Sequence, residues 1–208
     1  SKCPVATVDI VLNTTALANA TMSAGTIFKS NVGGTSYQFV TAADRTSSNV
    51  GSGIPYLNTK IYEGTYVTSR YTVDTSNADQ RFLITDNRAD TSTLRVQVQT
   101  SAGNTTVTSY TEATDITQLS TTSNVYFLQE VESAKFEVYF GDGIIGTALS
   151  DDNIVILTYV VGNREDANGA SIFTNSASIA GVNDVAVATI DVANGGGNPE
   201  SIQSIKYN

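Results

Sequence analysis

The sequence contains no histidine, no tryptophan and a single cysteine, Cys3, among its 208 residues. Without histidine, the Ser-His-Asp and Cys-His nucleophile arrangements and the commonest metal ligand are absent. One cysteine cannot form an internal disulfide, and without histidine it cannot complete a tetrahedral zinc site. Cys3 stands alone near the N-terminus, so we interpret it as incidental rather than catalytic.

The chain also lacks long hydrophobic runs and has few charges. The longest apolar stretch, residues 154–161, contains a threonine and is far too short to span a bilayer. The first residues show no apolar region of a signal peptide. Hydrophobic residues make up 40% and charged residues 15%, with abundant Ser, Thr, Asn and Gly. This composition favours strands joined by many turns, and no membrane association is expected.

The net charge of −9 is unevenly distributed along the chain. Residues 1–111 carry eight Lys/Arg and seven Asp/Glu, whereas residues 112–208 carry three and thirteen. The acidic half would repel nucleic-acid phosphates and anionic lipids, and would suit a basic protein partner. A solvated acidic surface is the simpler interpretation. We expect no nucleic-acid partner.

Apolar–polar alternation predicts strands along most of the chain. The predicted strand ranges are 5–12, 25–29, 37–40, 60–66, 69–73, 81–85, 125–128, 136–140, 154–161, 172–173 and 185–190, with a further hairpin over 94–110. Residues 44–55 are predicted as loop, and residues 114–124 as a polar loop with one helical turn. Near the end, Asn198, Pro199 and Glu200 form a helix start. Because the chain stops just beyond it, we expect the natural protein to continue.

Three glycines, Gly141, Gly143 and Gly146, have the spacing of the dinucleotide-binding fingerprint. That fingerprint requires a strand, a glycine turn and then a helix that meets a pyrophosphate. Only seven mostly polar or small residues, 147–153, separate it from the next predicted strand, which is too few for a crossover helix. We interpret the segment as a strand connection and expect no cofactor.

Carboxylates are the remaining candidates for chemistry. Asp151–Asp152 and Glu165–Asp166 are adjacent pairs, and the second falls near the position of a ribose ligand. Sequence neighbours on a strand point to opposite faces, so adjacency is poor support for a shared acid–base site. For calcium, Asp142, Asp151, Asp152 and Asn153 offer hard oxygen ligands, but their spacing does not match a calcium loop. No catalytic, cofactor-binding or metal residue is therefore assigned.

Three blocks of sequence resemble one known family. The first block consists of residues 136–146, then Leu149, Asn153, Tyr159, Gly162, residues 168–170 and Phe173. The others are residues 195–202, and residues 24–30 with 37–41. Together they resemble the baseplate wedge protein, the gene 6 product, of T-even-like contractile-tailed bacteriophages, which is related to the baseplate J family. Residues 60–130 carry little of this resemblance.

The resemblance implies a structural virion protein of the tail baseplate, assembled in the host bacterial cytoplasm, and not an enzyme. Its partners would be other wedge subunits and copies of itself, with no small-molecule substrate. The chain would be the middle of a longer protein that links neighbouring wedges. Two alternatives remain open: a carbohydrate-binding tail or adhesin module, and a carboxylate-based glycoside hydrolase.

We therefore expect an all-β fold of antiparallel β-sandwich modules, one inserted in the other. The outer module would comprise residues 1–66 plus 151–194, and the inserted module residues 67–150. Residues 195–208 would form a helix start leading to a missing C-terminal region. The position of the insertion follows from where the family resemblance thins.

Overall fold

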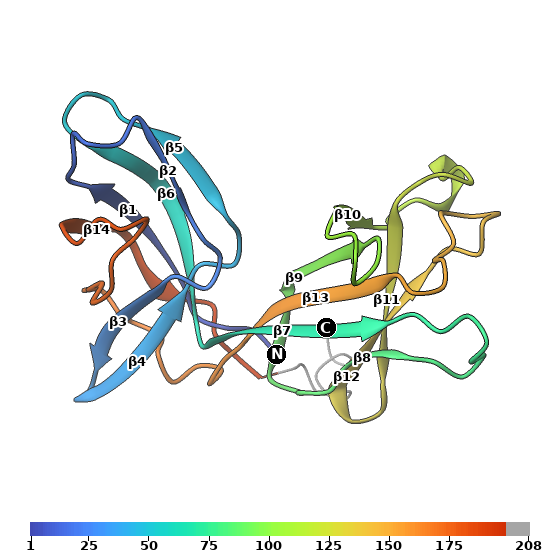
Figure 1. Cartoon of the computed structure of the whole chain (residues 1–208). Helices are drawn as coiled ribbons and strands as arrows, with labels where there is room; N and C mark the ends of the chain where they lie inside the picture. The colour runs from blue at the N-terminus through green and yellow to red at the C-terminus, as the bar shows by residue number, and fades with distance from the viewer. Residues whose placement is uncertain (199–208) are drawn as a thin grey trace. The chain divides into compact units, whose positions relative to one another are not determined.

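The computed structural model describes residues 1–198, which contain fourteen β-strands and two single-turn 3-10 helices (Figure 1). The chain divides into two compact units. Unit 1 comprises Ser1–Val67, Arg88–Thr93 and the residues from Val160 onward, and unit 2 comprises Thr68–Asn87 and Leu94–Tyr159. The fold class is thus mainly β, as predicted. The predicted helix start at residues 198–206 lies almost wholly outside the described residues.

Unit 1 contains a five-stranded sheet with the order β14-β1-β6-β4-β3 and a two-stranded sheet of β2 and β5. The strand bounds are β1 Val5–Leu12, β2 Asn19–Met22, β3 Ile27–Val32, β4 Thr35–Val40, β5 Arg45–Ser48, β6 Ile54–Glu63 and β14 Val185–Asn194. All of these strand pairs are antiparallel. The first strand of the chain therefore pairs with the last one described.

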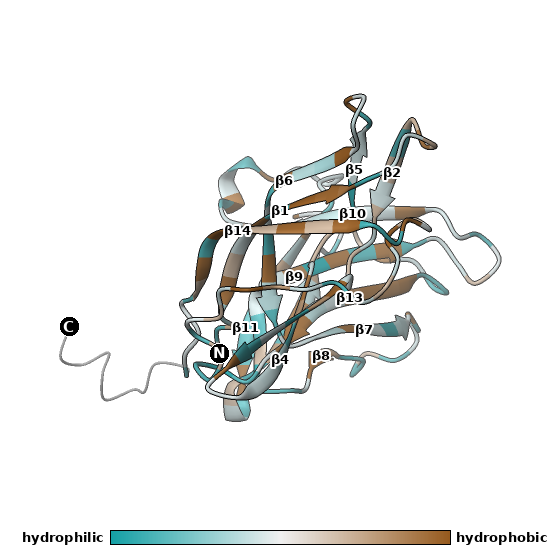
Figure 2. Cartoon of the chain, turned by 90° about the vertical axis from the view of Figure 1, so that its left-hand side faces the viewer, coloured by the Kyte–Doolittle hydropathy of each residue, from teal (hydrophilic) through white to brown (hydrophobic). Residues whose placement is uncertain are grey.

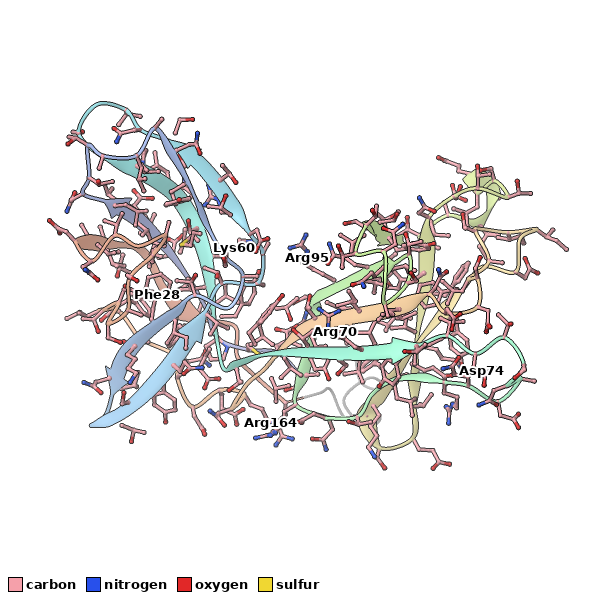
Figure 3. The ribbon with its side chains drawn as sticks, in the orientation of Figure 1. Phe28, Lys60, Arg70, Asp74, Arg95 and Arg164 are labelled. Atoms are coloured by element: carbon pink, nitrogen blue, oxygen red, sulfur yellow. The ribbon has the colours of Figure 1, made fainter. Side chains whose placement is uncertain are left out.

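The core of unit 1 follows directly from strand alternation. Every second residue of β1 is buried, ending at Ile10 and Leu12, and intervening residues face outward. Phe28, labelled in Figure 3, and Phe39 are fully buried on the β3–β4 hairpin. The ring of Phe39 meets Phe173 edge to face at 4.9 Å between centroids. Burial of such side chains contributes about 1.5–3 kcal/mol each.

Unit 2 is built on a seven-stranded sheet with the order β7-β13-β9-β10-β11-β12-β8. The bounds are β7 Thr65–Thr72, β8 Phe82–Ile84, β9 Ala89–Gln99, β10 Val107–Glu112, β11 Val125–Val131, β12 Lys135–Phe140 and β13 Ile154–Val161, with 3-10 helices at Ile116–Gln118 and Glu132–Ala134. The unit boundaries fall within β7, β9 and β13. One pair, β10 with β11, is parallel, which departs from the predicted antiparallel arrangement.

Four half-buried aromatic rings form a row in unit 2. Tyr71 meets Phe82, Phe82 meets Phe140, and Phe140 meets Tyr110, with centroids 5.7, 5.6 and 5.5 Å apart. All three contacts are edge to face, the geometry that aromatic quadrupoles favour. The row joins the consecutive strands β7 and β8 to β10 and β12, which come later in the sequence.

Most predicted strands are confirmed, but the predicted strand 60–66 is divided at Gly64 between β6 and β7, and two further predictions are wrong. Residues 44–55, predicted as loop, contain β5 and the beginning of β6. Residues 172–173, predicted as strand, lie outside the strands. Phe173 packs its ring against Phe39 in the core, and only the next residue, Thr174, forms an isolated bridge, to Lys29. The strand β2 was not predicted. Among residues 1–198, no helix is long and apolar enough to cross a membrane.

Candidate interaction surface

The glycine segment after β12 closes into a tight turn. A Cβ atom added at Gly141 would lie 2.4 Å from the carbonyl carbon of Gly146, so the backbone passes too closely for a side chain. The Gly143 amide donates to the Gly146 carbonyl at 3.0 Å, and both residues have positive φ. The chain then reaches β13 without a helix. The predicted strand connection is therefore confirmed.

Two backbone amides of this turn donate hydrogen bonds to a carboxylate of the same turn. The Asp142 carboxylate accepts hydrogen bonds from the Ile144 amide at 2.8 Å and the Ile145 amide at 3.0 Å. These backbone hydrogen bonds lower the pKa of Asp142, so the carboxylate is ionised at neutral pH. Glu165 and Asp166, the pair considered as a ribose ligand, belong to unit 1, whereas the glycines belong to unit 2. The Asp142 carboxylate thus bonds to two amides of its own turn.

The other calcium-ligand candidates also serve turns. Asp151 accepts from the Thr75 amide at 2.9 Å and its hydroxyl at 3.2 Å. Asn153 accepts from the Ser150 amide at 2.8 Å and donates to the Thr100 carbonyl at 2.9 Å. Asp152 has φ +63°, typical of a turn residue. Across residues 1–198, no group of three or more His, Cys, Asp or Glu residues is arranged to hold a metal.

A pocket of about 530 Å³ lies beside β12 in unit 2. Its lining includes Arg81, Glu137, Tyr139, Phe140 and Leu149. Arg81 Nε donates to Glu137 at 2.9 Å, and the Tyr139 hydroxyl donates to the same oxygen at 3.0 Å. The Arg81 hydrogen bond lowers the pKa of Glu137. A glycosidase general acid requires the opposite shift, so this pocket gives the hydrolase alternative no support.

Cys3 is buried in unit 1. Only 2% of its surface is exposed, and its amide donates to the Asp90 carboxylate at 2.9 Å. Burial, together with the nearby Asp90 and Glu63 charges, raises the pKa of the Cys3 thiol to about 12. A thiol that stays protonated is a poor nucleophile.

The negative charge is concentrated in unit 2. That unit carries four Lys/Arg and eleven Asp/Glu, a net charge of −7 out of the −9 of the whole chain. Of its cations, Arg70 and Arg95 lie on strands β7 and β9, whereas Asp74 lies in the loop after β7 (Figure 3). The two folded units, at −7 and −2, divide the charge less sharply than the two halves of the chain, at −10 and +1.

Two adjacent loops at one end of unit 2 expose apolar side chains. The Gly146 amide donates to the Ser120 carbonyl at 3.0 Å, and the Thr147 amide to the Ser123 carbonyl at 2.9 Å. These bonds hold the loop after β12 against the loop between β10 and β11. In Figure 1 both loops project from the same end of the β11 and β12 strands.

We call this region the isoleucine end. It consists of Ile116, Ile144 and Ile145, which are 62%, 74% and 42% exposed, with Asp115 and Asp142 beside them in sequence. Asp115 accepts from the Thr117 amide and hydroxyl, and these bonds lower its pKa, as the turn amides do for Asp142. This surface was not predicted from the sequence. An Ile-Ile pair between glycines, in a loop that is otherwise polar, could have indicated exposed apolar side chains.

Large exposed apolar side chains rimmed by charge are typical of protein–protein contact surfaces. The chain thus combines a mainly β fold with exposed apolar loops and with a glycine turn whose amides bond to Asp142. Residues 68–176 match the family described as bacteriophage baseplate wedge protein gp6, third domain. The match spans just over half of the chain, and the chain belongs to this family of structural phage baseplate proteins. A search of curated proteins found no match.

Proposed function

We propose that the chain is part of a wedge subunit of a T-even-like contractile tail, related to the baseplate J family, and that it links neighbouring wedges. Membership of the baseplate wedge family supports a structural role in the virion tail baseplate. The further resemblance of residues 24–30 and 195–202 supports the T-even-like assignment. Assembly in the host cytoplasm, with other wedge subunits and copies of itself, follows from this proposal.

The isoleucine end is the surface proposed to make the contact with another baseplate subunit. Three exposed isoleucines gain free energy when a partner covers them, at roughly 25 cal/mol per Å² of apolar surface. Ionised Asp115 and Asp142 select a partner whose matching face is basic around an apolar centre. The acidic character of the whole of unit 2 would speed the encounter with such a face.

The test measures association of the full-length protein with its neighbouring wedge subunit. Replacing Ile116 and Ile144 with serine should weaken binding at least tenfold, mainly through faster dissociation, because apolar contacts are lost. Replacing Asp142, Asp151 and Asp152 with asparagine should instead slow association and flatten its salt dependence. Asparagine can still accept the turn hydrogen bonds, so the loops are preserved.

The matched control neutralises Glu165 and Asp166, an exposed acidic pair in unit 1. This variant should keep the wild-type rate and salt dependence. If both sets of variants bind like the wild type, the isoleucine end is a solvated surface and the proposed contact lies elsewhere.

We also propose that residues 67–150 form a β module inserted into an outer module made of residues 1–66 and 151–194. The division of the structure into two units built from several segments supports it.

A further inference from the structure

β14 forms one edge of the unit 1 sheet, and one stretch of that edge is open. β1 pairs with it in unbroken register from Val185 to Thr189. Farther along, Ala193 exchanges backbone hydrogen bonds with Gly169 and Ala170, so that part of the edge is occupied. Within the described residues, the backbone of 185–189 bonds to β1 alone. The covering loop reaches this stretch only at its end, where the Thr189 hydroxyl donates to the Ser171 carbonyl at 2.6 Å.

The register shows which backbone groups face outward. The Asn13 amide donates to the Asp184 carbonyl at 2.9 Å, which fixes the parity of the β1–β14 ladder. In an antiparallel pair, every second residue turns its N–H and C=O groups away from the neighbouring strand. On β14 these residues are Val185, Val187 and Thr189.

The open stretch of this edge, residues 185–189, lacks the usual protection against strand pairing. Edge strands of soluble proteins are commonly guarded by Lys, Pro or a bulge, but residues 185–189 contain no charge and no proline and are free of bulges. Ala186, Ala188 and Ile190 are exposed on the outer face. Figure 2 shows hydrophobic segments along β14. Open backbone groups in this setting can pair with another extended strand.

We propose that this edge pairs with the same edge of a second copy of the chain, antiparallel about Val187. Val187 then faces its own counterpart, and Val185 faces the Thr189 of the second copy. All three outward-facing residues of each copy are used, and each such pair exchanges two backbone hydrogen bonds. Two five-stranded sheets would become one continuous sheet.

The sequence around the edge is compatible with this register. Ala186 lies opposite the second Ala188, so small side chains meet on the outer face. At the ends, Asp184 lies opposite Ile190 and Asp191 lies opposite Asn183, so no acid faces an acid. The inference deepens the proposed contact between copies but does not involve the isoleucine end, so the two proposals can fail separately.

The first test is sedimentation of the 208-residue chain over a range of concentrations, which should show a reversible dimer. Val187→Pro should weaken dimerisation about tenfold or more, because it removes the central outward N–H. Proline is tolerated there because this N–H does not bond to β1. Ile144→Ser at the isoleucine end should leave the dimer unchanged. A chain that stays monomeric at its highest soluble concentration overturns the proposal, as does a proline variant that dimerises normally.

Cysteine cross-linking tests the register. Val187→Cys should form an intermolecular disulfide on mild oxidation, because facing residues of a hydrogen-bonded pair have Cα atoms about 5.5 Å apart, within disulfide range. Thr189→Cys alone should not, but should cross-link when mixed with Val185→Cys. The parent chain should form no disulfide, since Cys3 is buried. Equal cross-linking of the two single variants at positions 187 and 189 would refute the register.

Discussion

Glu63 is a carboxylate at the end of β6 with only 1% of its surface exposed. It accepts the Asn163 amide at 2.7 Å and the Asn163 side-chain amide at 2.6 Å. These bonds favour the ionised form, but burial outweighs them and raises the pKa of Glu63 above its usual 4.5. Glu63 lies on the same face of β6 as buried Ile61. The alternation of the strand therefore predicts that position 63 is buried, but it does not predict a carboxylate there.

We predict that Glu63 makes unit 1 less stable as pH rises. Because the folded state holds the proton more tightly than the unfolded state, stability falls as pH rises from about 4.5 through the folded pKa, and is constant above it. Urea unfolding of the parent and Glu63→Gln from about pH 4 to about pH 7 measures this. The stability of Glu63→Gln relative to the parent should increase across that window. A difference that is independent of pH would contradict the prediction.

At the scale of the element, the connection between β12 and β13 depends on close backbone contact. Gly141→Ala would push a Cβ atom against Gly146 and should destabilise the protein by roughly 1–3 kcal/mol. Gly103 in the β9–β10 turn is the matched control, because a Cβ atom there meets nothing within 4 Å. Gly103→Ala should change stability by less than about 0.5 kcal/mol. Urea midpoints compare the two, and equal losses would mean that the turn opens easily.

The elements that sequence predicts well are those with a strong pattern. Strict alternation gave the bounds of β1, and a β-branched run gave those of β13. β2 and β5 escaped prediction because they are short and largely polar, and their pairing includes a 2.7 Å contact between the hydroxyls of Thr21 and Thr46. Such a pair becomes a strand only when both partners are present, which no local pattern shows.

The isoleucine end illustrates a second limit of sequence prediction. Ile144 and Ile145 lie in a segment whose glycines suggested a ligand site, yet their exposure depends on how the turn closes around Asp142. Their proximity to the loop that contains Ile116 depends on the Gly146 and Thr147 bonds to Ser120 and Ser123. Contacts of this kind join residues more than twenty positions apart, so neither spacing nor periodicity reveals them.

For the whole molecule, we predict that folding does not require a metal. The carboxylates and amides of Asp142, Asp151 and Asn153 are already engaged in turns. Thermal melts with and without EDTA should therefore differ by less than about 5 °C, roughly 1 kcal/mol for a unit of this size. Added calcium should have equally little effect. A larger shift in either experiment would reveal a site that these turns do not account for.

Because β1 pairs with β14, this pairing can form only after the ribosome has made almost the whole chain. Leu12 and Val185 pair directly, yet the ribosome makes them 173 positions apart. At about 5–20 residues per second, one side of β1 waits on the order of 10–30 s for its neighbour, while β6 arrives much sooner on the other side. During that interval a nascent chain offers β1 to any other strand nearby. Chains emerging from neighbouring ribosomes on one message would then compete with β14, and slower translation would increase mispaired product.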